Sequence, residues 1–275
     1  MSFFQNVKYE LQRRNMLTIL LILNISLFFV INISLHILKI NLVSYLALSL
    51  NLNEFILKFW TIITYMFSHE SLGHVFYNML LFYFSAKTFL NFLSEKKLLY
   101  VYIMSGLFGG LILLVLSAIS PAIFSGAYLY GASAAVIGIV TALATFLPNL
   151  PVSLFGVIEM KYKYYALLVF VLFTIVDFTI NTGGKISHFG GAFFGLFYGY
   201  MLKNGKDISQ FTFFKSKKSD SKLKVVHSNK STQTGVTSLE SQQTIDALLD
   251  KISKNGYDSL TKAEKELLFK LSQKK

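Results

Sequence analysis

A serine and a histidine stand at the beginning of two apolar stretches and could act together as a nucleophile and a base. Ser133 follows Gly131 at the head of one stretch, and His188 heads another that carries spaced glycines. A serine hydroxyl is a weak nucleophile until a base accepts its proton, and a neutral imidazole does this near pH 7. The two residues therefore predict nucleophilic catalysis, provided that the two stretches meet. Alone, Ser133 would be read as a small packing residue and His188 as an interfacial one.

Two further side chains are suited to stabilise the oxyanion that forms after such an attack. His74 and Asn78 are spaced i, i+4, so they share one face of an expected helix. Both can donate hydrogen bonds toward one point, where the backbone N–H of Ser133 would join them. His69, Glu70 and His74 superficially resemble the zinc-binding helix of metalloproteases. That helix needs histidines four residues apart, and here the separation is five, so we expect no metal.

The composition indicates that these residues lie in a membrane protein. Of the 275 residues, 53% are hydrophobic and only 15% are charged, whereas a soluble domain carries about a quarter charged residues. Charge-poor stretches recur through residues 1–206, and several approach the ~20 residues that cross a hydrocarbon core. The net charge of +12 comes from residues that flank these stretches or lie in the tail. This placement favours membrane topology over nucleic-acid binding. The chain has no cysteine, which excludes disulfides and thiolate sites.

The expected architecture is an all-α polytopic membrane protein with six spans and a small cytoplasmic helical tail. Basic residues gather on one side of this arrangement, so both termini should be cytoplasmic. The first stretch lacks a small-residue cleavage site and is interpreted as a retained span. Residues 39–69 are interpreted as an amphipathic loop in the outer interface, because a seventh span would put the termini on opposite sides. The spans are predicted at Met16–Leu38, His74–Leu93, Leu98–Ser117, Gly131–Leu147, Tyr164–Ile180 and Ser187–Leu202.

This topology brings the chemically interesting residues to one level. The second, fourth and sixth spans run in the same direction, so His74, Ser133 and His188 all lie near the outer face. Small residues at helix faces allow backbones to approach closely. A contact between the fourth and sixth spans through such faces would bring Ser133 and His188 within hydrogen-bonding distance. The glycines expected to form these faces are Gly131 and Gly138 on the fourth span and Gly191, Gly195 and Gly199 on the sixth.

The chain changes character after the last span. We predict three parts: a membrane domain over residues 1–206, a flexible basic linker over 207–243 and a helical tail over 244–275. The first tail helix should run through Ile245, Leu248, Leu249 and Ile252 and end at Asn255-Gly256. The second should begin at Thr261, which has Glu264 three residues later, the spacing of a capping box.

Three motifs resemble those of the rhomboid intramembrane serine proteases. They are Trp60–Asn78 (WTIITYMFSHESLGHVFYN), Gly131-Ala132-Ser133-Ala134, and His188 with its glycine ladder, and they cover about residues 55–202. The resemblance implies a six-helix core, a membrane-embedded loop between the first two spans and a Ser–His dyad without an aspartate. It makes Ser133 the nucleophile and His188 the general base. It also assigns the oxyanion hole to His74, Asn78 and the Ser133 amide, and a structural role to His69.

Two residues depart from the family pattern, and one carboxylate could add to it. Many members have glycine where this chain has Ala134, and some have an aromatic residue packed on the histidine where it has Ile137. Asp177 lies within the expected fifth span, and an intramembrane carboxylate is a functional candidate. It could orient His188 as a third member. Since the resemblance implies a dyad, a hydrogen-bonded position near the outer end or a place in the lining of a water pocket is favoured.

The sequence therefore predicts an intramembrane serine endopeptidase that cleaves single-span membrane proteins near their outer face. Its partners would be these substrates and the lipid bilayer, with no nucleic acid, cofactor or metal. The alternative is a non-catalytic rhomboid-like protein that binds membrane clients, but both members of the dyad are present. A transporter or channel is disfavoured because no matched halves or further intramembrane charges occur. The absence of targeting signals and the lysine-rich, cysteine-free composition favour a bacterial inner membrane.

Overall fold

The computed structural model describes residues 15–124, 126–154, 156–175, 182–211, 244, 246–252 and 259–272. The chain divides into two compact units, residues 1–215 and 216–275. The boundaries predicted at residues 206 and 243 remain predictions.

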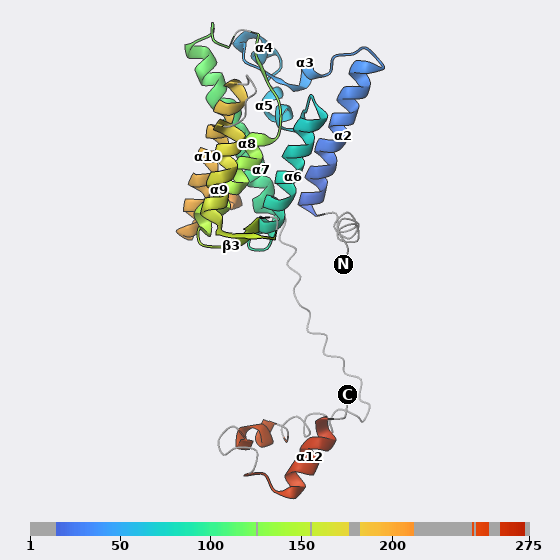
Figure 1. Cartoon of the computed structure of the whole chain (residues 1–275), viewed down its shortest axis with the longest axis vertical. Coiled ribbons are helices and arrows are strands. Elements are labelled where there is room, and N and C mark those ends of the chain that lie inside the picture. The colour runs from blue at the N-terminus through green and yellow to red at the C-terminus, as the bar shows by residue number, and fades with distance from the viewer. Residues whose placement is uncertain are drawn as a thin grey trace. The chain divides into compact units, whose positions relative to one another are not determined.

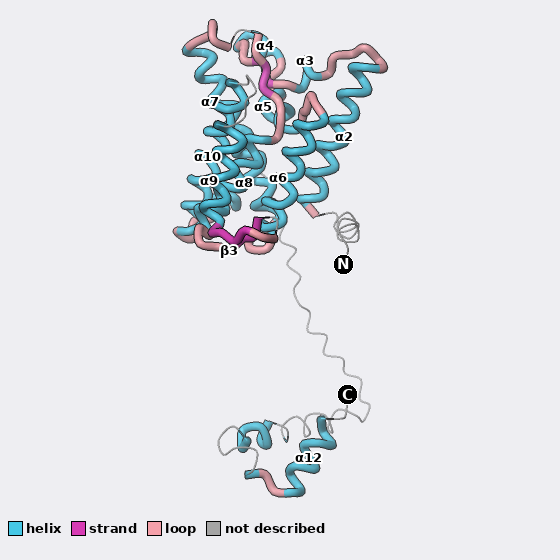
Figure 2. Tube along the Cα trace, viewed as in Figure 1, coloured by secondary structure: helices cyan, strands magenta, loops and turns pink. Residues whose placement is uncertain are grey.

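The first unit is a bundle of helices (Figures 1 and 2). Its helices lie close to the six expected spans, except that the last begins at Thr182 rather than at Ser187. The helix therefore includes Gly183 and Gly184, which precede the predicted start. The helices are α2 (Met16–His36), α6 (Leu72–Leu90), α7 (Glu95–Ile119), α8 (Ser133–Phe146), α9 (Tyr162–Phe170) with the π-helical turn η2 (Val171–Ile175), and α10 (Thr182–Lys203), followed by a 3-10 turn, η3 (Ile208–Phe211).

Helix length and apolarity alone identify two membrane-spanning candidates within the described residues. These are α2 and α7, while α8 and the combined α9 and η2 are apolar but shorter. The helical character of the chain is thus as expected, and the number of spans is not fixed by this criterion. Large apolar side chains such as Ile22, Phe29 and Ile33 are exposed on α2. Such exposed apolar side chains are compatible with contact with lipid hydrocarbon.

Helix α8 forms the centre of the bundle and positions the candidate site. Every residue from Ala134 to Leu143 is buried. The helix packs chiefly against α10 and α7, with further contacts to α6 and α9. Its side chains are small or apolar and carry no charge, so neighbouring helices can approach it from several directions. This burial explains why so short a helix is held firmly.

The segment after α2 is more deeply folded than the interfacial loop expected from the sequence. It contains α3 (Val43–Leu46), β1 (Leu48–Ser49), α4 (Leu52–Leu57), α5 (Thr61–Thr64) and the 3-10 turn η1 (Tyr65–Phe67). Trp60 is partly exposed, but Tyr65 and Met66 are completely buried. The Tyr65 hydroxyl donates to the Gly106 carbonyl of α7 at 2.6 Å. The segment therefore enters the bundle at its end, because its aromatic residues find buried partners there.

Two short antiparallel strand pairs were missed by the all-α expectation. Strand β1 pairs with β2 (Tyr128–Leu129), in the register Leu48 to Leu129. Strand β3 (Pro151–Leu154) pairs with β4 (Ile158–Lys161) between α8 and α9. The β1–β2 pair joins segments far apart in sequence, so local patterns could not predict it. It also fixes the loop that leads into α8.

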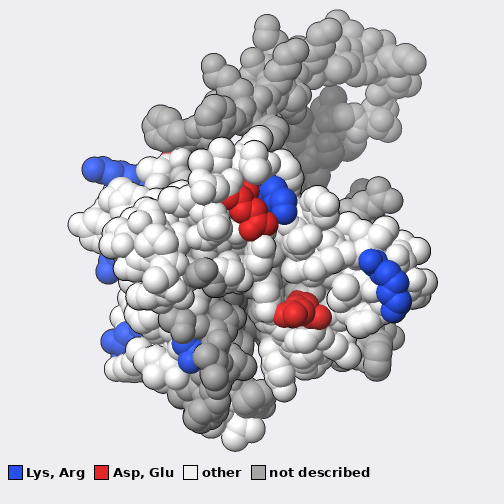
Figure 3. Space-filling view, turned by 90° about the horizontal axis from the view of Figure 1, so that it is seen from above, with Lys and Arg blue, Asp and Glu red and all other residues white. Residues whose placement is uncertain are grey.

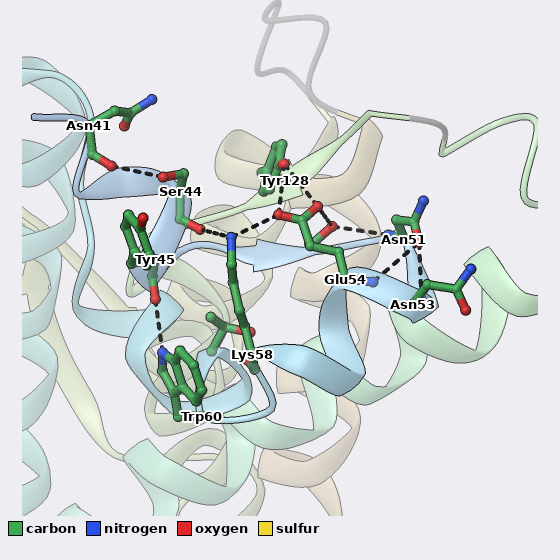
Figure 4. Close-up of polar contacts among 11 residues, drawn as sticks. Asn41, Ser44, Tyr45, Asn51, Asn53, Glu54, Lys58, Trp60 and Tyr128 are labelled. Carbon is green, nitrogen blue, oxygen red and sulfur yellow. Dashed lines mark hydrogen bonds and ion pairs between the residues drawn. The ribbon is translucent and has the colours of Figure 1, made fainter.

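A polar cluster, here called the Glu54 clasp, strengthens this connection (Figure 4). The Glu54 carboxylate accepts hydrogen bonds from Ser49 Oγ at 2.7 Å and from the Tyr128 hydroxyl at 3.0 and 3.1 Å. Lys58 Nζ lies 3.1 Å from the same carboxylate. The Ser49 hydrogen bond, followed by the contacts with Lys58 and Tyr128, lowers the pKa of Glu54 despite some desolvation. An acidic and a basic side chain lie side by side on the sparsely charged face seen in Figure 3.

The second unit contains the expected helical elements as far as it is described. Residues 246–252 are helical, and α12 runs over Lys262–Ser272. The capping box is confirmed, because Thr261 N–H donates to Glu264 at 2.8 Å and Glu264 N–H donates back to Thr261 Oγ1 at 3.4 Å. Lys251 pairs with Glu264 at 2.7 Å. Ile245 and the predicted end at Asn255-Gly256 lie outside the described residues.

Candidate active site

Ser133 is the first residue of α8, and the turn before it depends on glycine. Gly131 has φ +115°, a conformation that favours glycine. Its N–H donates to the Tyr65 carbonyl at 2.9 Å. A Cβ at Gly131 would lie 2.6 Å from Cε1 of His74. The expectation that Gly131 faces the sixth span is therefore wrong, because the residue precedes the helix and contacts the histidine of α6.

The expected pairing of serine and histidine is present in the geometry. His188 lies in the second turn of α10, and its Nε2 is 2.7 Å from Ser133 Oγ. This is an ordinary hydrogen-bonding distance. The His188 side chain is buried, with 6% of its surface exposed. The arrangement allows the imidazole to take the hydroxyl proton.

Glycines on α10 allow the two helices to meet along their backbones. A Cβ at Gly191 would lie 2.1 Å from the Ala134 carbonyl oxygen, and one at Gly195 would lie 2.3 Å from that of Gly138. Gly199 repeats the contact one turn further along, against Ala142. Any side chain here would push α10 away from α8. The ladder expected from the sequence thus sets the spacing that brings His188 to Ser133.

Gly138 serves two neighbours rather than one. A Cβ on it would lie 1.9 Å from Ser105 Oγ of α7 and 3.0 Å from the Gly191 carbonyl oxygen of α10. The sequence predicted the contact with the sixth span but not that with the third. Ala134, which follows Ser133, is also closely packed against α7. Ala134 is 1% exposed, and its methyl group lies beside Gly109 of α7.

A cavity of about 980 Å³ brings together the four polar residues predicted for the site: Ser133, His188, His74 and Asn78. Tyr128 of β2 and Tyr130 just after it also line the cavity, as do Leu172 and Phe173 of η2. Asn78 Nδ2 donates to the backbone carbonyl of His74 at 3.0 Å, which leaves the second amide hydrogen for another acceptor. The predicted oxyanion donors therefore border the same space as the nucleophile.

Two hydrogen-bond donors at the beginning of α8 have different surroundings. The Ala132 N–H donates to His69 Nε2 at 3.4 Å, so His69 holds the turn before the serine. His69 is only 1% exposed and packs edge-on against the His74 ring. The Ser133 N–H is one of the first amides of the helix, which have no partner within it. It is positioned to bind a negatively charged oxygen at the positive end of the helix dipole.

The outer wall of the cavity carries an acidic residue and a phenol. The Tyr130 hydroxyl donates a hydrogen bond to Glu70. Burial, together with the neighbouring Glu70 carboxylate, raises the pKa of Tyr130 to about 12. Tyr130 also packs edge-on against His74 at a ring separation of 6.1 Å. This phenol stays protonated at neutral pH and helps to hold the His74 ring.

One residue of the site was missed by sequence reasoning. Thr174 of η2 places its Oγ1 3.2 Å from Nδ1 of His188, and it is 3% exposed. The only signal in the sequence was a single hydroxyl within the apolar run VLFTIV. Asp177, considered as an orienting group for His188, lies outside the described residues. Ile137 is fully buried in α8.

Within the described part of the chain, no group of three or more histidine, cysteine, aspartate or glutamate side chains is gathered around a potential metal position. His69 and His74 lie near each other, with ring centroids 5.1 Å apart, but no third such ligand completes the set among those residues. The expectation of a site without metal stays a prediction.

These features define a class of protein: a helical bundle whose central helix begins with a serine hydrogen-bonded to a histidine of the last helix. Residues 57–205 match the model of the Rhomboid domain, and the chain belongs to the rhomboid family. It is therefore an integral membrane protein. Residues 234–274 match a family of unknown function, DUF6576. No match to a curated protein is found.

Proposed function

We propose that this protein is an intramembrane serine endopeptidase that cleaves transmembrane segments of other membrane proteins. Ser133 is the nucleophile and His188 the general base. The observation that carries the proposal is the 2.7 Å separation of Ser133 Oγ and His188 Nε2 beside a large cavity. Membership of the rhomboid family supports the same activity.

The reaction follows from the positions of these two side chains. Nε2 of His188 accepts the hydroxyl proton while Ser133 Oγ bonds to the carbonyl carbon of the substrate, whose oxygen takes up the negative charge. His188 then gives this proton to the leaving nitrogen as the C–N bond breaks, which leaves an acyl ester on Ser133. A water molecule that reaches the cavity then attacks the ester carbon while His188 takes its proton. His188 gives this proton to Ser133 Oγ as the ester C–O bond breaks, which releases the carboxyl product and restores the serine.

The oxyanion is stabilised by donors that border the cavity. The Ser133 N–H at the beginning of α8 supplies one hydrogen bond, and the side chains of His74 and Asn78 supply others. Gly131 allows the turn before Ser133 to lie against the His74 ring. The donors are therefore set in place before the substrate arrives, which reduces the reorganisation needed in the transition state.

The proposed substrates are single-span membrane proteins, cut near the outer face of the bilayer. We infer a six-span core with both termini in the cytoplasm, in a bacterial inner membrane. Family resemblance implies that the substrate enters laterally beside the fifth span, and Leu172 and Phe173 of η2 line the cavity on that side. A helical peptide bond is shielded by its own hydrogen bonds, so helix-breaking residues near the cut should help.

The test is cleavage of a model single-span substrate by the purified protein in liposomes. Ser133→Ala and His188→Ala should each reduce cleavage by at least about a thousandfold, and the double variant should be no worse, because the pair acts as one unit. A fluorophosphonate should label the wild type at Ser133. Ser117→Ala is the matched control, since Ser117 is a buried serine of α7 whose hydroxyl bonds to the Leu114 carbonyl.

The outcome separates the proposal from its alternative. Cleavage that survives Ser133→Ala would overturn the assignment of the nucleophile. A wild-type protein that binds the substrate in a pull-down but neither cleaves it nor reacts with the fluorophosphonate would be a non-catalytic binder of membrane clients.

A further inference from the structure

Both ring nitrogens of His188 face a hydroxyl group. Nε2 lies 2.7 Å from Ser133 Oγ, and Nδ1 lies 3.2 Å from Thr174 Oγ1. All three side chains line or adjoin the same buried region, and Thr174 is 3% exposed. The imidazole is thus held between the nucleophile on α8 and a threonine at the end of the fifth helix.

This arrangement determines which nitrogen carries the proton in a competent site. For Nε2 to accept the serine proton, the proton of the neutral ring must be on Nδ1. A threonine oxygen has lone pairs that can accept a hydrogen bond from that Nδ1–H. It can do so both before the proton transfer and in the imidazolium that follows, because Nδ1 is protonated in both states.

The backbone at Thr174 is unusual in a way that places the hydroxyl here. Thr174 lies in η2, a π-helical turn, and is the buried residue of its five members. Its neighbours Leu172 and Ile175 are exposed, at 47% and 64%. Such turns widen a helix locally and often occur at functional sites. The turn therefore directs the one polar side chain of an apolar run toward His188.

An aromatic contact fixes this part of the fifth helix against α10. Phe170, at the end of α9, packs edge-on against Phe189, next to the histidine, with ring centroids 5.1 Å apart.

A buried threonine hydroxyl away from water also needs a hydrogen-bonding partner to offset its desolvation. The contact with His188 supplies one.

We propose that Thr174 is a positioning residue that holds the base in its reactive orientation and tautomer. This inference rests on the proposed protease function. Thr174 does not touch the substrate's reacting atoms, so its effect should appear in turnover and not in substrate affinity. It should also appear in the intrinsic reactivity of Ser133, because the serine depends on the same histidine for activation.

The experiment compares Thr174→Val, which removes the oxygen at constant shape, with Thr174→Ser, which keeps it. Thr174→Val should lower kcat about tenfold to a hundredfold, part of the 10²–10⁴ that acid–base catalysis contributes, with KM unchanged. Its rate of labelling by a fluorophosphonate should fall in parallel. Thr174→Ser should remain close to the wild type in both measurements. Thr145→Val is the matched control, since the Thr145 hydroxyl bonds within its own helix, to the Thr141 carbonyl at 2.8 Å.

The outcomes distinguish this inference from the proposed function. If the wild type cleaves and Thr174→Val matches it in kcat and labelling, Thr174 has no positioning role and the protease function stands. If the wild type neither cleaves nor reacts with the fluorophosphonate, the function itself fails. If Thr174→Val does not fold, Thr174→Ser and Thr174→Ala are compared, because these two differ only in the oxygen. Equal kcat for this pair would overturn the proposal.

Discussion

The two ends of the loop–helix unit that carries Ser133 are held in contrasting ways. Along α8, contact with α10 is made by backbone against backbone, with positions such as Gly195 that leave no room for a single carbon atom. Before α8, the loop is held by the β1–β2 pair and the Glu54 clasp, whose charged members Glu54 and Lys58 are partly exposed. The first attachment is therefore sensitive to an added carbon atom, and the second is weakened when Glu54 becomes protonated.

The largest effect on the stability of the fold is expected from adding one methyl group to the contact between α8 and α10. Gly195→Ala would place a Cβ 2.1 Å from Thr141 Oγ1 and 2.3 Å from the Gly138 carbonyl oxygen. The backbone of α8 would have to move, which should cost about 1–3 kcal/mol of unfolding free energy and reduce cleavage. Thermal unfolding in detergent and turnover measure the two effects.

Gly73→Ala is the control for this substitution. Gly73 also lies in a helix, but a Cβ there meets nothing within 4 Å. Alanine should stabilise that helix by up to about 1 kcal/mol. If Gly195→Ala proved as stable as Gly73→Ala, the close contact of α8 and α10 would not be a constraint on the fold.

A smaller effect on stability is expected from a substitution in the Glu54 clasp. Glu54→Gln removes the charge that Ser49, Lys58 and Tyr128 stabilise, and at neutral pH it should cost no more than about 1 kcal/mol, since the pair is partly exposed. The pKa of Glu54 is lowered in the folded protein, so its contribution is present above the ordinary value of 4.5 and is lost as the pH falls through the folded value. The stability difference between wild type and variant should therefore shrink on acidification.

Unfolding curves at several pH values check this, with Glu159→Gln on the exposed strand β4 as the control. A difference between Glu54→Gln and wild type that grows toward low pH would contradict the assigned sign. It would mean that Glu54 carries a raised pKa in the folded chain.

The smallest effect is expected from removing the second unit. The residues that line the cavity all belong to the first unit. Truncation after Lys218 should leave turnover of a model substrate nearly unchanged in detergent, because the tail would act on client choice, stability or association. A large fall in turnover with the fold intact would show that the tail supports the catalytic core.

The sequence was informative where the site depends on spacing along a helix. Gly191, Gly195 and Gly199 repeat every four residues, which a helix turns into one face, and the structure packs this face against α8 as expected. The contact brings His188 to Ser133. The capping box of the tail was predictable for the same reason, since its partners are three residues apart.

The sequence was less informative where long-range contacts decide the geometry. A threonine in an apolar run gives no sign that a π-helical turn will direct it toward a histidine. Gly131 was assigned to the wrong neighbour because its positive φ, rather than a helix face, sets its position. The pairing of β1 with β2 connects residues 48 and 129, and no local pattern encodes such a contact.

The fit of Ala134 beside Gly109 has a consequence for exchanging parts between family members. A Cβ at position 109 would lie 2.8 Å from the Ala134 methyl carbon, so a side chain on α7 would compete with that of Ala134 for the same space. A chimera that imports an α7 with a larger residue at 109 needs more than glycine at 134, because the same Cβ would lie 2.8 Å from the Ser187 carbonyl oxygen of α10. An imported α7 of this kind therefore has to be transplanted together with the parts of α8 and α10 that face position 109.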